Sequence, residues 1–175
     1  MEMTLPPIVR RAEASDAAAL AKLAATTFTE TFGRLYSPED LTAFLATARS
    51  EERYRRMFSE PRTALWVAAE RNGELIGYVL AGLCKLPVQN LAPQAGEIKE
   101  LYLLSAHQGR QIGTRLLTTA LEWLEAEEFS PLYLGVWSEN LGAQRLYGRF
   151  GFNKMGEYDF PVGKHVDREF ILIRR

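Results

Sequence analysis

The sequence predicts an α/β (α+β) domain with seven strands. Three observations support this class. The first third of the chain has a helical pattern, two apolar runs joined by an Asn-Gly turn follow, and a strand, a glycine-rich turn and an amphipathic helix then succeed one another. Because 175 residues is the length of one domain, we expect a single domain over 1–175.

Composition narrows the function classes. Hydrophobic residues make up 47% and charged residues 25% of the chain, which is typical of a globular protein, and a net charge of -1 argues against nucleic-acid binding. One cysteine, Cys84, and two histidines, His107 and His165, are too few for an internal disulfide or a structural zinc site, so we expect no metal. The N-terminal "MEMTLPPIVRRAEASD" has no apolar core of a signal peptide, and no run approaches the ~18 apolar residues of a membrane span. We therefore expect a cytoplasmic protein that does not contact membranes.

The first third should be helical after a short strand at 7–12. A helix is expected over 16–33, because Ser15 or Asp16 can cap its start and Gly33 can end it. Its apolar face comprises Leu20, Leu23, Ala24, Thr27 and Phe28. Two shorter helices are expected over 37–48 and 50–58, the first with a proline and two acids in its opening turn.

The middle of the chain predicts strands. Residues 63–70 and 74–83 are apolar, partly β-branched runs, and the Asn72-Gly73 pair between them is a strong hairpin signal. Residues 85–95 contain two prolines and no periodicity, so they should form a loop. A further strand is expected over 96–104, with Ile98, Leu101 and Leu103 as its apolar positions.

The last third should add two helices and three strands. From Ile112 a helical apolar stripe comprises Leu116, Leu117, Ala120, Leu121 and Leu124. A strand at 131–136 precedes a short helix whose apolar face comprises Ala143, Leu146, Tyr147 and Phe150, and which Gly151 closes. Strands over 152–160 and 166–175 complete the chain.

The turn before the long helix is a candidate phosphate site. Residues 107–117, "HQGRQIGTRLL", place Gly109 and Gly113 at a helix N-terminus, where free backbone N–H groups and the helix dipole favour an anion. The spacing is neither that of an ATP-binding P-loop nor that of the three-glycine dinucleotide fingerprint. Glycines that serve chain geometry alone are the other interpretation of an isolated pair.

The surrounding "LYLLSAHQGRQIGTRLL" resembles the acetyl-CoA-binding motif of the GCN5-related N-acetyltransferases (the GNAT superfamily), a strand followed by Q/R-x-x-G-x-G/A and a helix. The resemblance implies acetyl-CoA as co-substrate, bound by the motif residues Gln108, Gly109, Arg110, Gln111, Ile112, Gly113 and Thr114. Gln111 replaces the usual first glycine of the motif, so we expect weakened or reshaped binding. Arg110 and Arg115 could screen phosphate charge.

A second segment, "LGVWSENLGAQRLYGRFGF", resembles the later family motif N-x-x-A-x-x-x-Y-x-x-x-G-F, matched by Asn140, Tyr147, Gly151 and Phe152. In the family the asparagine lies beside pantetheine and the tyrosine points at the thioester sulfur. Taken alone, Asn140 could be a helix cap and Tyr147 a core residue. The order of elements also matches the family along most of the chain, which implies a mixed, mostly antiparallel seven-stranded sheet with a bulged, splayed strand and helices on both faces.

The resemblance implies a direct acetyl transfer in which a base first deprotonates an ammonium group. Glu97 is the expected base, acting through a water, with Glu100 as the alternative on the other face of the strand. A solvated strand charge is the competing interpretation of each. Tyr147 would protonate the departing thiolate.

The same resemblance assigns backbone roles to the strand that precedes the turn. Leu101 and Leu103 would pair with pantetheine, and an N–H at Leu101 or Tyr102 would face the oxyanion. Cys84 lies in an apolar segment and is expected in the core rather than as a nucleophile.

"TFTETFGRLYSPEDLTAFL" and "GEYDFPVGKHVDREFIL" are similar to the PaiA-like bacterial spermidine/spermine N-acetyltransferases. This similarity implies a small amine such as a polyamine as acceptor. Acidic and aromatic residues that would flank a polycation are Glu30, Glu39, Asp40, Tyr36, Trp137, Tyr158 and Asp159. The alternatives are a protein lysine or N-terminus as acceptor, or a non-catalytic domain that binds acetyl-CoA. The apolar "FILIRR" at 170–175 is expected at a sheet edge that could pair in a homodimer.

Overall fold

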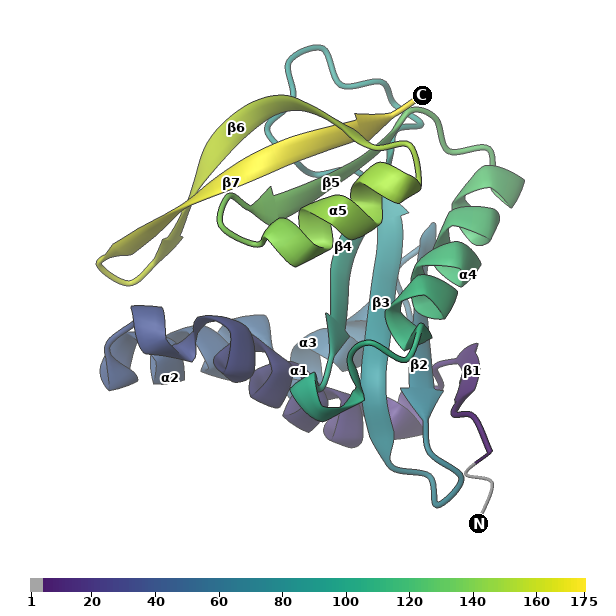
Figure 1. The fold of residues 1–175 in the computed structure, drawn as a ribbon, viewed down its shortest axis with the longest axis vertical. Coiled ribbons are helices and arrows are strands. Elements are labelled where there is room, and N and C mark those ends of the chain that lie inside the picture. Colours follow the sequence, from purple (N-terminus) through teal and green to yellow (C-terminus); the bar gives the residue numbers. More distant parts are fainter. Residues whose placement is uncertain (1–4) are drawn as a thin grey trace.

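A computed structural model describes residues 5–175, and its seven strands form one sheet in the order β1-β2-β3-β4-β5-β7-β6 (Figure 1). The strands are β1 (Ile8–Arg11), β2 (Thr63–Ala69), β3 (Leu75–Leu83), β4 (Gly96–Leu103), β5 (Leu132–Trp137), β6 (Asn153–Val162) and β7 (His165–Arg174). The helices are α1 (Ala17–Phe32), α2 (Pro38–Ala48), α3 (Glu51–Met57), α4 (Ile112–Ala126) and α5 (Leu141–Arg149). The expected α+β class and the expected order of elements are confirmed.

Helix caps follow the expected positions, with one difference in detail. The hydroxyls of Ser37 and Ser50 accept from backbone N–H groups at the starts of α2 and α3. Asp16 is the N-cap residue of α1 but does not cap it with its side chain. Its carboxylate instead pairs with Arg10 at 2.8 Å, which ties β1 to the start of the helix. The ion pair therefore takes the carboxylate that the sequence assigned to capping.

All neighbouring strands are antiparallel except β4 and β5, which α4 connects as a parallel pair. Their pairing is short. It begins at Gly96 with Leu132 and ends at Ile98 with Leu134, although β4 runs on to Leu103. Beyond that point the two strands diverge, with β4 following β3 and β5 following β7 (Figure 1).

A β-bulge marks the place where the strands part. Leu80 of β3 pairs with Glu100, whereas the next residue, Ala81, pairs with Ile98, so Lys99 is an extra residue in β4. The side chain of Lys99 lies back along β3 and donates to the carbonyl of Leu83 at 2.6 Å. The bulged, splayed strand that the family resemblance implied is therefore present.

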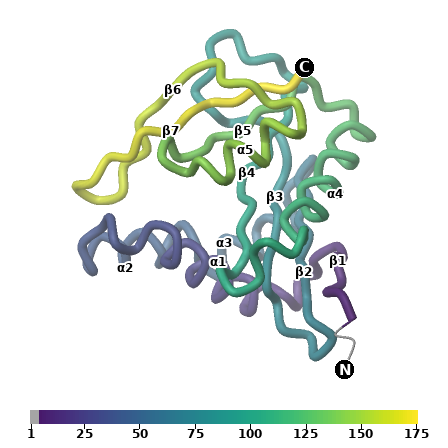
Figure 2. The backbone as a smooth tube through the Cα atoms, viewed as in Figure 1, coloured from purple at the N-terminus to yellow at the C-terminus, as the bar shows by residue number. Residues whose placement is uncertain are grey.

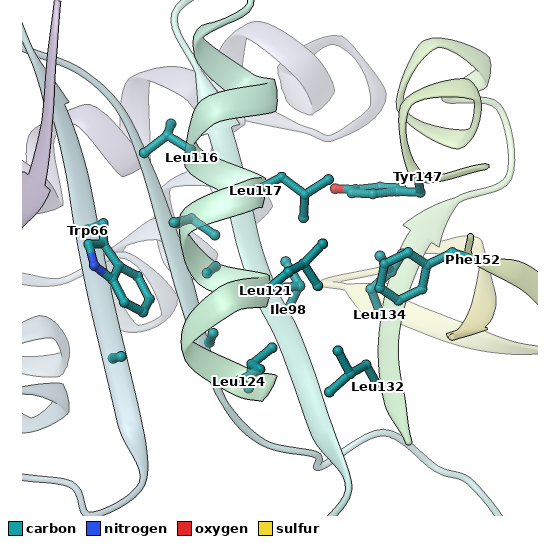
Figure 3. Close-up of a cluster of buried hydrophobic side chains, with 14 of the residues drawn as sticks. Trp66, Ile98, Leu116, Leu117, Leu121, Leu124, Leu132, Leu134, Tyr147 and Phe152 are labelled. Atoms are coloured by element: carbon teal, nitrogen blue, oxygen red, sulfur yellow. The ribbon is translucent and has the colours of Figure 1, made fainter. Parts of the chain in front are cut away.

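Two hydrophobic layers cover the faces of the sheet. On one face α4 packs its expected apolar stripe against β2, β3 and β4, with Tyr147 and Phe152 extending the same core (Figure 3). On the other face α1 and α3 cover β2 and β3, and Tyr54 and Tyr78 are fully buried there. Both faces are thus covered by helices, as expected.

The position of residues 170–175 corrects an expectation. Strand β7, which contains residues 170–174, pairs with β5 on one side and with β6 on the other, so it lies inside the sheet. The edge is β6, and the tip of the β6–β7 hairpin extends over α2 (Figure 2), where the Lys164 backbone N–H donates to Asp40. The apolar character of this segment is therefore explained by burial within the sheet, not by an exposed edge.

We predict that Leu124→Ala lowers the free energy of unfolding by about 2–5 kcal/mol, the usual cost of a cavity left by a fully buried leucine. Leu124 is 0% exposed at the end of α4, far along the helix from the glycine-rich turn (Figure 3). Urea denaturation measures the change. Glu122→Ala, on the exposed face of the same helix, is the matched control and should change stability by less than about 0.5 kcal/mol. Equal losses in both variants would contradict the packing described here.

Candidate active site

A cavity of about 560 Å³ lies where β4 and β5 part, next to the start of α4 and beside α5. Its lining includes almost every residue that the sequence assigned to acetyl-CoA: Leu101, Tyr102, Leu103, Gln108, Gly109, Gln111, Ile112, Gly113, Thr114, Asn140 and Tyr147. Arg110 is absent from the lining. Residues from three segments far apart in the chain therefore meet at one site.

The turn residues Gly109 and Gln111 have left-handed backbone conformations, with φ of +75° and +60°. A glycine adopts this region freely, whereas a residue with a Cβ does so at a cost of about 1–2 kcal/mol. Gln111 also forms the N-cap of α4. The glycine usual at this position in the family would adopt the left-handed conformation at no cost. Gln111 adopts the same conformation in this chain.

Neither of the two arginines near the turn points into the cavity. Arg115 donates to the backbone carbonyl of Pro7 at 2.8 Å, which holds the segment before β1 against α4. Arg110 lies 3.4 Å from a ring nitrogen of His107 and 4.0 Å from Glu70. The expected screening of phosphate by these side chains is therefore not arranged in the structure, and backbone N–H groups are left as the main anion donors.

Asn140 and Tyr147 lie on the opposite side of the cavity from the turn. The Asn140 side chain accepts from the Ala143 N–H at 3.1 Å, so it caps α5 as well as lining the cavity. Tyr147 points from α5 toward Leu117 of α4 (Figure 3) and is 7% exposed. Burial, with the nearby charges of Tyr102 and Glu169, raises the pKa of Tyr147 above its ordinary value, which keeps the hydroxyl protonated.

The two acids expected as bases occupy different environments. Glu97 lies outside the cavity lining, and its carboxylate accepts from the Lys85 N–H at 2.8 Å and from Lys99 at 3.2 Å. Glu100 lines the cavity. However, it is held by Arg49 at 3.6 Å, by Arg53 at 2.5 Å and by two tyrosine hydroxyls.

Burial alone would raise the pKa of Glu100. The charges of Arg49 and Arg53 outweigh burial and hold the pKa below its ordinary value. A carboxylate stabilised in its ionised form in this way is a weak proton acceptor.

A smaller recess of about 90 Å³ opens beside the main cavity. Its walls are mostly aromatic and come from α1, the segment after it, β4 and β6: Phe28, Phe32, Tyr36, Tyr102, Tyr158 and Phe160. Arg49, Lys99 and Glu169 supply its charges. Five residues line both the recess and the main cavity, and Glu169 is the only carboxylate among them. The boundary between the recess and the cavity is therefore formed by Phe32, Lys99, Tyr102, Gly135 and Glu169.

Glu169 is the acid of the site that the sequence reasoning missed. It lies on β7 between Trp137 of β5 and Tyr158 of β6, and it is 9% exposed. Burial, with a smaller contribution from the charge of Asp167, raises the pKa of Glu169 to about 7. The signal in the sequence was the alternation of Asp167 and Glu169 before the apolar run 170–173, which puts two acids on one face of the strand.

The residues proposed to surround a polycation divide into two groups. The aromatic ones, Tyr36, Trp137 and Tyr158, line the cavity or the recess. The acids do not line either: Glu30 accepts from the Ser105 N–H, Asp40 from the Lys164 N–H, and Asp159 pairs with Arg168. Glu39 is exposed in the first turn of α2. The structure therefore brings the aromatic rings to the site without these four acids.

Cys84 follows β3 and is buried in a cluster with Tyr133 and Ile171. Burial raises the pKa of its thiol to about 11. Since only a thiolate is an effective nucleophile, this position fits the expected core role.

Comparison with known proteins supports the same class. The profile of the acetyltransferase (GNAT) family matches residues 19–152. An uncharacterised N-acetyltransferase from Lactobacillus delbrueckii subsp. lactis is 30% identical over 146 residues, covering 83% of this chain and 84% of that protein. The spermine/spermidine N(1)-acetyltransferase of Bacillus subtilis is 31% identical over 100 residues, 55% of this chain and 64% of that protein.

Solved structures show the same fold. The PaiA N-acetyltransferase of Thermoplasma acidophilum, crystallised with coenzyme A, aligns with a TM-score of 0.77 at 19% identity, over 98% of this chain and 99% of that one.

The chain belongs to the GNAT family of acetyltransferases. It is an N-acetyltransferase, and acetyl-CoA is its co-substrate. Residues 5–175 contain no group of three or more His, Cys, Asp or Glu side chains placed to hold a metal ion. None of the helices in this part of the chain combines the length and the apolar content of a membrane span.

The raised pKa of Glu169 predicts a pH-dependent difference in stability between the protein and Glu169→Gln. The folded state holds the proton more tightly than the unfolded state, whose pKa is near 4.5. This stabilisation is complete below pH 4.5 and is lost as the pH rises through about 7. Relative to Glu169→Gln, the protein should lose about 3 kcal/mol of unfolding free energy across this window. Urea denaturation at a series of pH values measures it, and a constant difference would contradict the buried environment of Glu169.

Proposed function

We propose that the protein transfers the acetyl group of acetyl-CoA directly to the primary amine of a small molecule. The observation that carries the proposal is the cavity between the parted strands, which joins the turn, Tyr147 and the aromatic recess in one continuous site. Acetyl-CoA would place its pyrophosphate at the N-terminus of α4 and its pantetheine between β4 and β5. The acceptor would enter from the recess.

The chain's own groups suit the two halves of the transfer. Backbone groups of β4 beyond Ile98 have no partner in β5, so Leu101 and Leu103 can pair with pantetheine and an N–H of Leu101 or Tyr102 can stabilise the oxyanion. The Tyr147 hydroxyl, kept protonated by burial, would give its proton to the sulfur as the C–S bond breaks. Asn140 would hold the pantetheine arm while it caps α5.

The acceptor we propose is a small amine, with spermidine and spermine as the first candidates. The Bacillus subtilis relative is named for these polyamines. The recess offers aromatic faces to a cation, and the cations on its wall, Lys99 and Arg49, are each paired with a glutamate. Phe160 on β6 lines the recess, and its ring centroid lies 6.0 Å from that of Phe44 on α2, so β6 and α2 meet beside the recess. Such a contact favours a small molecule over a protein chain as the acceptor.

Release of free thiol from acetyl-CoA tests the proposal against spermidine, spermine, putrescine, a set of amino acids and a lysine peptide. We predict turnover on at least one small amine, and a fall of about 10²-fold or more in kcat for Tyr147→Phe because the leaving thiolate loses its acid. The affinity for acetyl-CoA should stay unchanged. Tyr133→Phe, a buried tyrosine outside the cavity lining, is the control and should keep full activity.

Three other results would contradict the proposal. Turnover on the lysine peptide alone would identify a protein acceptor. Acetyl-CoA binding without thiol release on any acceptor would indicate a regulatory domain. Gln111, which stands where the family motif has glycine, is the feature that would fit such a domain. Absence of acetyl-CoA binding would exclude the cavity as its site.

A further inference from the structure

We propose that Glu169 is the general base of the transfer and that it takes the proton of the acceptor ammonium at the mouth of the aromatic recess. This inference rests on the proposed function and adds a residue that the sequence motifs do not contain. It follows from the position of the carboxylate, from the state of the other acids nearby, and from the groups that surround it.

The position of Glu169 meets the geometric requirement for a base. An amine in the recess must approach the thioester through the boundary between the recess and the main cavity, and Glu169 lines both. Gly135 across the sheet leaves space for the hydroxyl of Tyr158, which closes the far wall. An amine held at this boundary would contact the carboxylate before it reached the carbonyl carbon.

The other carboxylates are committed elsewhere. Among the residues that line the two spaces, the only carboxylates are Glu100 and Glu169. Glu100 is fixed as an anion by Arg49 and Arg53. Asp167, behind Glu169 on β7, accepts from the Tyr36 hydroxyl and lies 2.9 Å from a ring nitrogen of His165. Glu169 remains as the acid available to an incoming ammonium.

The surroundings of Glu169 suit a base that works near neutral pH. Burial and the charge of Asp167 both favour its protonated form, so the pKa of about 7 lies in the range where a base is most effective. The titratable and charged groups that lie beside it or line the two spaces with it are Asp167 on β7, Tyr158 on β6, Lys99, Glu100 and Tyr102 on β4, Tyr36 after α1, Arg49 after α2, and Tyr147 and Arg149 on α5. Of these, Asp167 contributes the charge that raises the pKa.

The step balances without any further reactant. The ammonium gives one proton to Glu169, and the freed lone pair forms the C–N bond with the acetyl carbon. The C–S bond breaks with its electron pair on sulfur, which takes a proton from Tyr147. The second proton lost by nitrogen reprotonates Tyr147 through solvent, and Glu169 releases its proton to solvent, leaving an acetamide and coenzyme A.

The test is the pH profile of kcat/KM for the protein, Glu169→Gln and Glu169→Asp, using the best acceptor of the amine panel. We expect Glu169→Gln to lower kcat by about 10²–10⁴-fold and to remove the acidic limb with a midpoint near pH 7, which leaves only the rise with free amine at higher pH. Glu169→Asp should recover part of the rate. The affinity for acetyl-CoA should not change. Glu157→Gln, an exposed acid on β6 paired with Lys154 and Arg168, is the matched control and should behave as the unaltered protein.

The variant Asp167→Asn tests the role of Glu169 by a second measurement, the pH at which the acidic limb falls. A purely structural role of Glu169 would leave that pH unchanged. The variant keeps a hydrogen-bond acceptor for Tyr36 but removes the charge that raises the pKa of Glu169, so the acidic limb should shift to lower pH. Full activity and an unchanged limb in Glu169→Gln would overturn the assignment while leaving the proposed function intact. Failure of the unaltered protein to acetylate any amine would overturn both.

Discussion

One extra residue in β4 determines where the sheet opens into two halves. Because Lys99 is inserted opposite the Leu80–Ala81 step of β3, β4 leaves β5 after Ile98 and continues with β3 alone. The hydrophobic layers hold the two halves of the sheet in place: α4 covers β2 to β4, and Tyr147 and Phe152 pack from the other half into the same core (Figure 3). The cavity is the space between the halves, so the turn, the backbone of β4 and Tyr147 share one site without being close in sequence.

Burial and pairing give four neighbouring acids four different environments. Two arginines keep Glu100 ionised, Lys99 and a backbone N–H hold Glu97, and Tyr36 and His165 occupy Asp167. Glu169 is buried beside a like charge, and its pKa is raised to about 7. Residue type alone therefore does not indicate which acid can accept a proton. The elements packed around each carboxylate decide it.

Local patterns predicted most of the fold, because hydrophobic period, caps and turn residues act within a few positions of each other. The stripe from Leu116 to Leu124 and the Asn72-Gly73 turn are examples. The pairing partners of a strand were harder to predict. The apolar segment 170–175 indicates burial, but its sequence does not show which strands flank it. Glu169, the base that we propose, could not be found by local reasoning, because it reaches the cavity only through the pairing of β7 with β5 and β6. The sequence did contain one indication of the bulge. Ile98 and Leu101, which face the same core, are three residues apart, whereas a regular strand repeats every two residues.

A crystal structure of the protein with coenzyme A would test the central claim most directly. The account predicts the pyrophosphate at the backbone N–H groups of Gln111 to Gly113, the pantetheine between β4 and β5 with its amides paired to Leu101 and Leu103, and the thiol within reach of the Tyr147 hydroxyl. Coenzyme A bound on another face, or β4 and β5 closed together beyond Ile98 with the ligand excluded, would contradict it.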